Sequence, residues 1–262
     1  MNLFLNAIAW ILDPANWKPG GISPLPIQDR IGEHLLYAVV ALSIAALIAL
    51  PLGFYIGHTG RGRQFVISFT GAMRALPTLG VLFFLTMVLG NIVRGASGIF
   101  WGTMIALIIL AIPSILAGAY AGLESVSRQT IDASRAIGMT EAQILTRVEI
   151  PLALPLIIGG LRAGALQIIA TAVIASYAGL GGLGRIIGSG IGLNDYDKIL
   201  GGAILVTVLA LIVDGAFALV QRFTRIPGSG ADAATPGARL RRRASRPSAA
   251  VETPNQERNV TA

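Results

Sequence analysis

Five long apolar runs alternate with short polar segments and predict membrane-spanning helices. A helix needs about 20 apolar residues to cross about 30 Å of hydrocarbon. The runs cover residues 34–57, 75–93, 99–123, 153–177 and 199–221, and only the last two contain a charge, Arg162 and Asp214 respectively. Only helices satisfy their own backbone hydrogen bonds in lipid without closing a barrel. We therefore predict an all-α membrane protein, a polytopic bundle of five to six helices.

The segments outside these runs define the expected domain organisation. Residues 3–12 are apolar but too short to span, so we expect an interfacial helix that ends at Asp13-Pro14. We expect residues 1–29 to form an external N-terminal segment and residues 30–226 to form the transmembrane domain. Residues 227–262 are rich in Gly, Ser, Ala, Pro and Arg, which is typical of a disordered tail. We expect this basic tail to bind membrane lipids and not nucleic acid.

The composition agrees with a membrane protein and excludes several kinds of site. Hydrophobic residues make up 54% of the chain and charged residues 13%, whereas a soluble domain has about 25% charged residues. The chain has no Cys, which excludes disulfides, zinc thiolate sites and thiol catalysis. Its two His residues, His34 and His58, lie at opposite ends of the first apolar run, where we expect them to be interfacial. We expect no catalytic residue and no metal site.

The distribution of basic residues predicts the orientation. Fourteen Lys and Arg residues lie in the segments on one side of the predicted spans, and five lie on the other side. The larger group includes Arg61, Arg63 and Arg74 in one predicted loop. Basic residues accumulate in cytoplasmic loops, so we expect the N-terminus outside and the C-terminus in the cytoplasm.

The segment between the third and fourth runs carries more signals than a connector needs. Residues 127–136 predict a short amphipathic helix, and Gly138 stands where a left-handed C-terminal cap would lie. Thr140 and Gln143 have the spacing of a capping box for a second helix that runs to Glu149 and is stopped by Pro151 and Pro155. The segment is either a loop on the membrane surface or a docking element whose apolar tip enters a groove of a cytoplasmic partner.

This segment resembles the EAA signature of importer-type ABC permeases. The signature is Glu-Ala-Ala, three residues, Gly, nine residues, then Ile, any residue and Leu-Pro. Here Asp132-Ala133-Ser134, Gly138 and Val148-Glu149-Ile150-Pro151 have every spacing of that pattern. Asp132, Ser134, Val148 and Ile150 depart from it conservatively, and Asp132 puts in doubt any role that needs the longer carboxylate.

The resemblance implies a fold, partners and a location. The fold is that of a type I ABC importer permease with cytoplasmic coupling helices that dock on an ATP-binding subunit. Two such subunits bind ATP and Mg, so this chain would bind no cofactor. A second permease copy or paralogue, an extracytoplasmic substrate-binding protein and a bacterial inner or plasma membrane complete the system. The implied coupling loop contains Asp132, Ala133, Ser134, Ala136, Ile137, Gly138, Met139 and Pro151.

Further residues are similar to one branch of this family, the osmoprotectant permeases. They are Ile150–Pro155, Gly160–Arg162, Ile168–Ala172 and Gly179–Gly184. The implied substrates are quaternary ammonium compounds such as glycine betaine, choline or carnitine. An amino-acid importer such as a methionine permease, which also has five spans, is the first alternative. A gradient-driven secondary transporter is the second, although it should carry several intramembrane ionisable residues.

Two further groups of residues are candidates for a role within the bundle. Arg162 and Asp214 lie at about the same predicted depth, about 10 Å from one surface at 1.5 Å per residue, so they either pair or reach separate partners. The glycine-rich turn is a candidate outer gate or hinge, or else a plain re-entrant loop. It lacks the strand and the Lys-Ser/Thr of a phosphate-binding loop. The candidate gate residues are Gly179, Gly181, Gly182 and Gly184.

Overall fold

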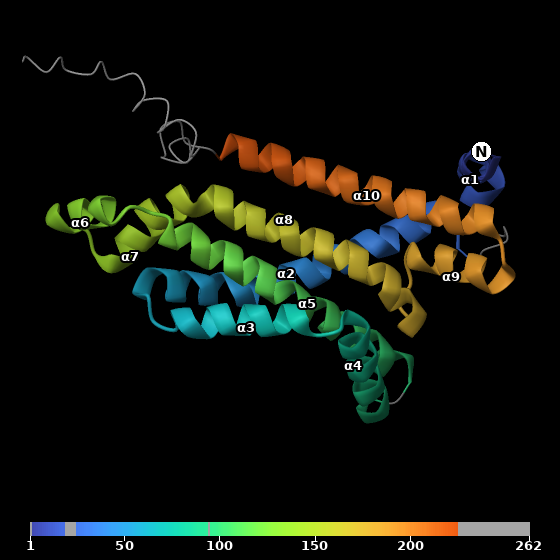
Figure 1. The fold of residues 1–262 in the computed structure, drawn as a ribbon, viewed down its shortest axis with the longest axis horizontal. Helices are drawn as coiled ribbons and strands as arrows, with labels where there is room; N and C mark the ends of the chain where they lie inside the picture. Colours follow the sequence, from blue (N-terminus) through green and yellow to red (C-terminus); the bar gives the residue numbers. More distant parts are fainter. Residues whose placement is uncertain (1, 19–24, 94, 225–262) are drawn as a thin grey trace, which may run out of the picture. The chain divides into compact units, whose positions relative to one another are not determined.

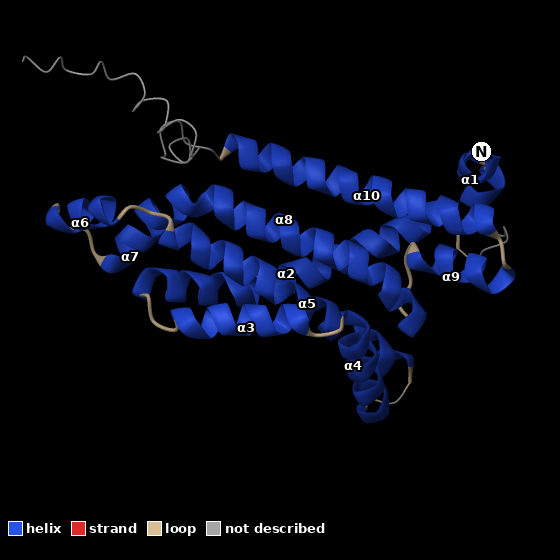
Figure 2. Cartoon of the chain, viewed as in Figure 1, coloured by secondary structure: helices blue, strands red, loops and turns tan. Residues whose placement is uncertain are grey.

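The computed structural model describes residues 2–18, 25–93 and 95–224, and these residues form helices without any strand (Figure 2). The tail predicted from residue 227 lies outside the described residues. The elements are α1 (Asn2–Leu12), η1 (Pro14–Trp17), α2 (Ile27–Thr59), α3 (Arg63–Ala75), α4 (Thr78–Ile92), α5 (Ala96–Glu124), α6 (Arg128–Ala136), α7 (Glu141–Ile144), the π-helix η2 (Leu145–Glu149), α8 (Ile150–Ala175), η3 (Ser176–Ala178), α9 (Gly184–Leu193) and α10 (Tyr196–Phe223).

Among the described residues, four helices are long and apolar enough to cross a membrane. They are α2, α5, the continuous helix Glu141–Ala178 and α10. These helices contain four of the five predicted runs. In the most apolar stretch of α5, 61% of residues are buried, against 6% in α10. The difference makes α5 the centre of the bundle, where it packs against α2, α4 and α8 (Figure 1).

The second predicted run, residues 75–93, forms the helix α4 over only 15 residues, which is too short to count as a span by itself. The helix α3 precedes it where a loop was predicted, and α3 and α4 meet at an angle of 88° and count as a fifth span only if taken together. The break has a local cause, because a residue before proline is disfavoured in the helical region. Leu76, which precedes Pro77, has an extended backbone at φ −69° and ψ 134°. Arg63 and Arg74, predicted to lie in one loop, instead lie near the two ends of the helix α3.

Small residues bring the central helices together. The buried face of α2 carries a stripe of small residues spaced three or four apart, which places them on one side of the helix. A Cβ added at Gly118 of α5 would lie 2.5 Å from the Cα of Gly160 in α8. The two backbones are thus in direct contact, as small residues allow where lipid supplies no hydrophobic drive. The stripe on α2 is Ala38, Ala41, Ala45, Ala49 and Gly53.

The N-terminal segment contacts the bundle. The helix α1 ends at Leu12, and Asp13 caps η1 by accepting a hydrogen bond from the Ala15 backbone N–H at 2.9 Å. Trp10 lies against Gly201 of α10, where an added Cβ would approach its ring to 2.7 Å. The helix α1 is therefore packed against α10.

Candidate functional site

The helix α6 begins and ends at the residues that the sequence indicated. The Ser127 hydroxyl caps it by accepting from the Thr130 backbone N–H at 3.1 Å. At its end, Gly138 N–H donates to Arg135 O at 2.9 Å and Met139 N–H donates to Ser134 O at 3.2 Å. This is a Schellman motif, which satisfies helix carbonyls that otherwise lack partners. The motif requires the left-handed backbone of Gly138, which has φ +86°.

The helix α7 begins with the predicted capping box. Thr140 N–H donates to the Gln143 side chain at 2.9 Å, and Gln143 N–H donates to the Thr140 hydroxyl at 3.3 Å. The predicted end of this second helix is wrong, because α7, η2 and α8 form one continuous helix. Pro151 lies in the first turn of α8, and a π-helix precedes it. Local π adjustments of this kind let membrane helices accommodate prolines.

The turn between α6 and α7 presents an apolar tip, which we define as residues 136–139. Ile137 is 79% exposed, the largest exposed side chain of this tip. Ala136 and Gly138 are also exposed, and Met139 is half-buried. Of the other residues predicted for the coupling loop, Asp132 and Ala133 are exposed, Ser134 is buried and Pro151 is half-buried.

Arg135 fixes the geometry of the segment. Its Nε and one terminal nitrogen donate to the two carboxylate oxygens of Glu141 at 2.7 and 3.1 Å. Its other nitrogen donates to Asp132 at 3.2 Å. The carboxylate of Glu141, followed by that of Asp132, raises the pKa of Arg135 above its usual value, so the guanidinium stays charged. The carboxylate of Asp132, which is shorter than the Glu side chain of the signature, thus contacts Arg135 within α6.

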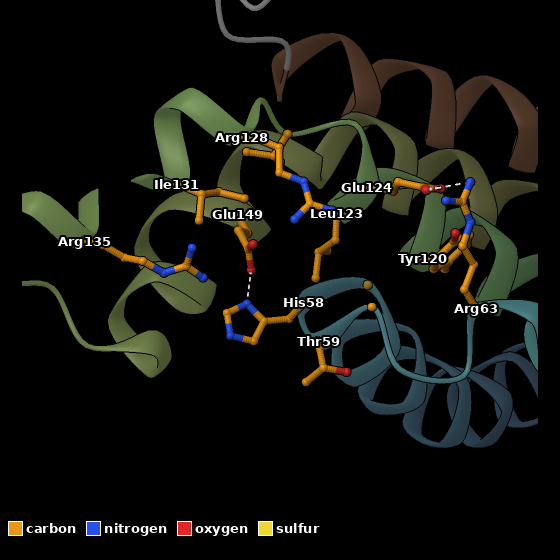
Figure 3. Close-up of a pocket in the computed structure, with 13 residues that line it drawn as sticks. His58, Thr59, Arg63, Tyr120, Leu123, Glu124, Arg128, Ile131, Arg135 and Glu149 are labelled. Carbon is orange, nitrogen blue, oxygen red and sulfur yellow. Dashed lines mark hydrogen bonds and ion pairs between the residues drawn. The ribbon is translucent and has the colours of Figure 1, made fainter. Parts of the chain in front are cut away.

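His58 lies beneath this segment, and this contact was not predicted. Its Nδ1 is 2.5 Å from Glu149 Oε2 and its Nε2 is 3.3 Å from Glu141 Oε2. His58 and Glu149 border a polar cavity of about 220 Å³ at the ends of α2 and α5 (Figure 3). The sequence placed His58 at a membrane interface, and no local motif connects it with Glu149, 91 residues away.

Arg162 and Asp214, predicted as a possible pair, are in direct contact. The Nε and one terminal nitrogen of Arg162 donate to the two carboxylate oxygens of Asp214, each at 2.5 Å. The two side chains come from α8 and α10, which pack against each other. Near the same end of these helices, Gln221 of α10 donates to Pro155 O of α8 at 2.7 Å. Two polar links therefore join α8 and α10.

The glycine-rich turn lies at the other end of the bundle, between η3 and α9. Gly179 and Gly182 have φ of +108° and +86°. Glu33 accepts from the Gly182 backbone N–H at 2.8 Å, and its carboxylate would collide with a Cβ at Gly181.

The other two residues at this turn complete its packing. Gly184 lies against Val173 O and Ser176 at the end of α8. His34 is fully buried beside the turn, with its Nε2 3.1 Å from Ile169 O. The turn is thus fixed to α2 by contacts that a gate would have to break.

Comparison with known proteins gives one family and one fold. Residues 49–226 match the family of binding-protein-dependent transport system inner membrane components. The glycine betaine/carnitine/choline transport system permease protein OpuCB of Bacillus subtilis is 35% identical over 193 residues, which are 74% of this chain and 86% of that protein. The choline transport system permease protein OpuBB of the same organism is 33% identical over 190 residues, 72% of this chain and 84% of that protein.

Solved structures share the fold. An inward-facing structure of the MetNI methionine ABC transporter superposes with a TM-score of 0.67 at 22% identity, and the match covers 76% of this chain and 96% of that one. An amino acid ABC transporter crystallised with histidines gives a TM-score of 0.63 at 20% identity, covering 84% of this chain and 97% of that one. At these identities the likeness concerns the fold alone.

Proposed function

The chain belongs to the family of binding-protein-dependent transport system inner membrane components, and from this premise we propose that it is the permease subunit of an ATP-driven osmoprotectant importer. ATP and Mg would bind in a partner subunit, and this chain would supply the path and the moving helices. The observation that carries the proposal is the exposed apolar tip, held rigidly by two caps and by Arg135.

The tip is suited to dock on an ATP-binding subunit. Ile137 projects from a turn whose backbone is fixed on both sides, so little conformational freedom is lost when it enters a groove. The helix from Glu141 to Ala178 is continuous, so a displacement of the tip would move α8 directly. A movement of α8 would then displace α5 through the Gly118–Gly160 contact and α10 through the Arg162–Asp214 pair.

The charges support an orientation with this end of the bundle in the cytoplasm. Basic residues accumulate on the cytoplasmic side of membrane proteins. At the end that carries α6 and α7, the described basic residues are Arg61, Arg63, Arg128, Arg135, Arg147 and Arg222. At the opposite end they are Lys18, Arg30, Arg185 and Lys198, and Arg74, near the far end of α3, is counted with neither group. The glycine-rich turn would then face the outside, where the substrate-binding protein delivers its cargo, and it would act as a gate by breaking and remaking the contact between Gly182 and Glu33.

The choice of substrate is supported by the named relatives. Proteins that transport glycine betaine, carnitine or choline are 33–35% identical over most of their length. The methionine and amino acid transporters share the fold at 20–22% identity. Specificity would lie mainly in the external binding protein, where aromatic faces hold a quaternary ammonium group.

The assembly would contain two permease chains and two ATP-binding subunits. Many large apolar side chains are exposed on this single chain, including Phe83, Phe84 and Met87 on α4. Such a surface is suited to lipid and to a second permease, either another copy or a paralogue. The basic tail would add a contact with anionic lipid.

Reconstitution tests this function. The permease would be purified with its ATP-binding subunit, placed in proteoliposomes and supplied with the binding protein. We expect uptake of labelled glycine betaine, choline or carnitine that needs both ATP and the binding protein. Uptake of methionine alone would favour the amino-acid importer. Uptake driven by a proton or sodium gradient without ATP would favour a secondary transporter.

A further inference from the structure

Both ring nitrogens of His58 contact the segment that carries the tip. The Nδ1 atom is 2.5 Å from Glu149 and the Nε2 atom is 3.3 Å from Glu141. Glu141 is the first residue of α7 and Glu149 is the last residue of η2. The ring therefore contacts both ends of the stretch 141–149. His58 itself stands one residue before the end of α2.

The contact with Glu149 is the stronger of the two. The side chain of Glu149 is 3% exposed, whereas that of Glu141 is 55% exposed and is already bound by Arg135. A buried carboxylate is costly unless it is hydrogen-bonded. Within the described residues, His58 is the side chain that donates to the Glu149 carboxylate. Loss of the ring would therefore leave a buried acid without that partner.

A cavity lies beside these residues. It separates the end of α2 from α6, and Arg128 and Arg135 of α6 line it opposite His58 (Figure 3). Arg63 and Glu124, which also line it, are paired with each other at 2.9 Å. His58 lines this cavity and contacts the segment directly through Glu149 and Glu141.

We propose that His58 is a positioning residue that joins α2, through Glu149 of η2, to the segment that carries the tip. When the tip moves, the displacement passes along the chain into α8 and also across the His58–Glu149 contact into α2. This inference rests on the proposed function, because it concerns how movement of the docking tip reaches the membrane helices. It assigns a role in transport to a contact that no motif of the segment contains.

Three substitutions at His58 test the inference, because the amide nitrogens of Asn and Gln occupy roughly the positions of Nδ1 and Nε2. His58→Asn keeps a donor toward Glu149, His58→Gln keeps one toward Glu141 and His58→Ala keeps neither. Uptake and ATP hydrolysis would be measured on the same reconstituted complexes. We expect His58→Ala and His58→Gln to lower the substrate transported per ATP by about tenfold, within the usual range of coupling between sites. His58→Asn should retain most of the ratio, and Glu149→Gln should lower it.

The results distinguish a positioning role from a purely structural one. An unchanged ratio of uptake to hydrolysis in His58→Ala would overturn the inference. Equal losses in His58→Asn and His58→Ala would also overturn it, since the donor toward Glu149 would then be irrelevant. If none of the three variants assembled with the ATP-binding subunit, His58 would act in folding and the inference would be wrong. A wild-type complex without ATP-driven uptake would instead overturn the proposed function itself.

Discussion

Arg162 and Asp214 join α8 to α10 by two parallel hydrogen bonds, although 52 residues separate them in the sequence. Charged residues within membrane helices are costly and usually face the bundle, where they pair. Planar guanidinium and carboxylate groups fit this two-bond geometry, which adds orientation as well as energy. The pair thus sets the relative register of the two helices.

We expect Asp214→Asn to lower the melting temperature of the detergent-solubilised subunit by a few degrees. The substitution leaves the Arg162 charge without its carboxylate, which is worse than losing one solvated surface charge. Arg222→Gln, near the end of α10, is the matched control and should change the melting temperature little. The exchange Arg162→Asp with Asp214→Arg should restore part of the loss. Equal melting temperatures for wild type and Asp214→Asn would show that the pair contributes nothing to stability.

The order of the four long spans follows from the sequence because each is a long apolar run bounded by charge or turn residues. The helices α3 and α9 were not predicted, because α3 carries Arg63 and Arg74 and α9 is rich in glycine. Capping is also local, so the caps at Gly138, Thr140 and Gln143 follow from residue type and spacing alone. The break between α3 and α4 has a local signal in Pro77, but the apolar run around it conceals the bend. The predicted end of the second helix is wrong because a π-helix before Pro151 has no sequence pattern comparable to a cap.

Contacts between distant helices are less accessible from sequence. Arg162 and Asp214 can be considered together because their charges are conspicuous and their depths are similar. No comparable signal connects His58 with Glu149. His58 directly follows the first apolar run, and Glu149 lies in the segment between the third and fourth runs. The direct contact of Gly118 with Gly160 depends on helix rotation, which the abundance of small residues in both helices leaves undetermined.

Gly160→Ala should destabilise the subunit by about 1–3 kcal/mol, the usual cost of overpacking. A Cβ there would lie 2.8 Å from Gly118 Cα and 3.1 Å from Ser114 O. Both are backbone atoms, so relief requires α5 and α8 to separate. Gly159→Ala is the control, because its Cβ would meet only the Gln221 side-chain nitrogen at 3.5 Å. Chemical unfolding in mixed micelles would compare the two, and similar stability would contradict close packing of α5 on α8.

Gly138→Ala should reduce ATP-driven uptake while leaving membrane insertion intact. Nothing lies within 4 Å of a Cβ at this position, so the substitution causes no collision. The cost comes from φ +86°, where a residue with a side chain loses about 1–2 kcal/mol. We expect Gly138→Asn to retain more uptake, because Asn tolerates this conformation better. Gly138→Asp should abolish uptake, because it also places a negative charge on the apolar tip. Wild-type uptake in Gly138→Asp would show that the tip is not part of the docking surface.

Ile137→Cys should reveal which side of the membrane the tip faces. The chain contains no Cys, so one introduced thiol reports on one position without background. Ile137 is 79% exposed, and Leu193, at the end of α9, is 63% exposed and lies toward the opposite end of the bundle. With a membrane-impermeant maleimide, we expect Ile137→Cys to react in inverted vesicles but not in intact spheroplasts.

Leu193→Cys should show the reverse and serves as the matched control for reagent access. Addition of the purified ATP-binding subunit to inverted vesicles that contain the permease alone should then slow labelling of Ile137→Cys, because docking covers the tip. It should leave Arg222→Cys, near the end of α10 and away from the tip, at its original rate. Labelling of Ile137→Cys from the outside would reverse the proposed orientation. Labelling from the inside that the ATP-binding subunit fails to slow would retain the orientation and exclude residues 136–139 from the docking surface.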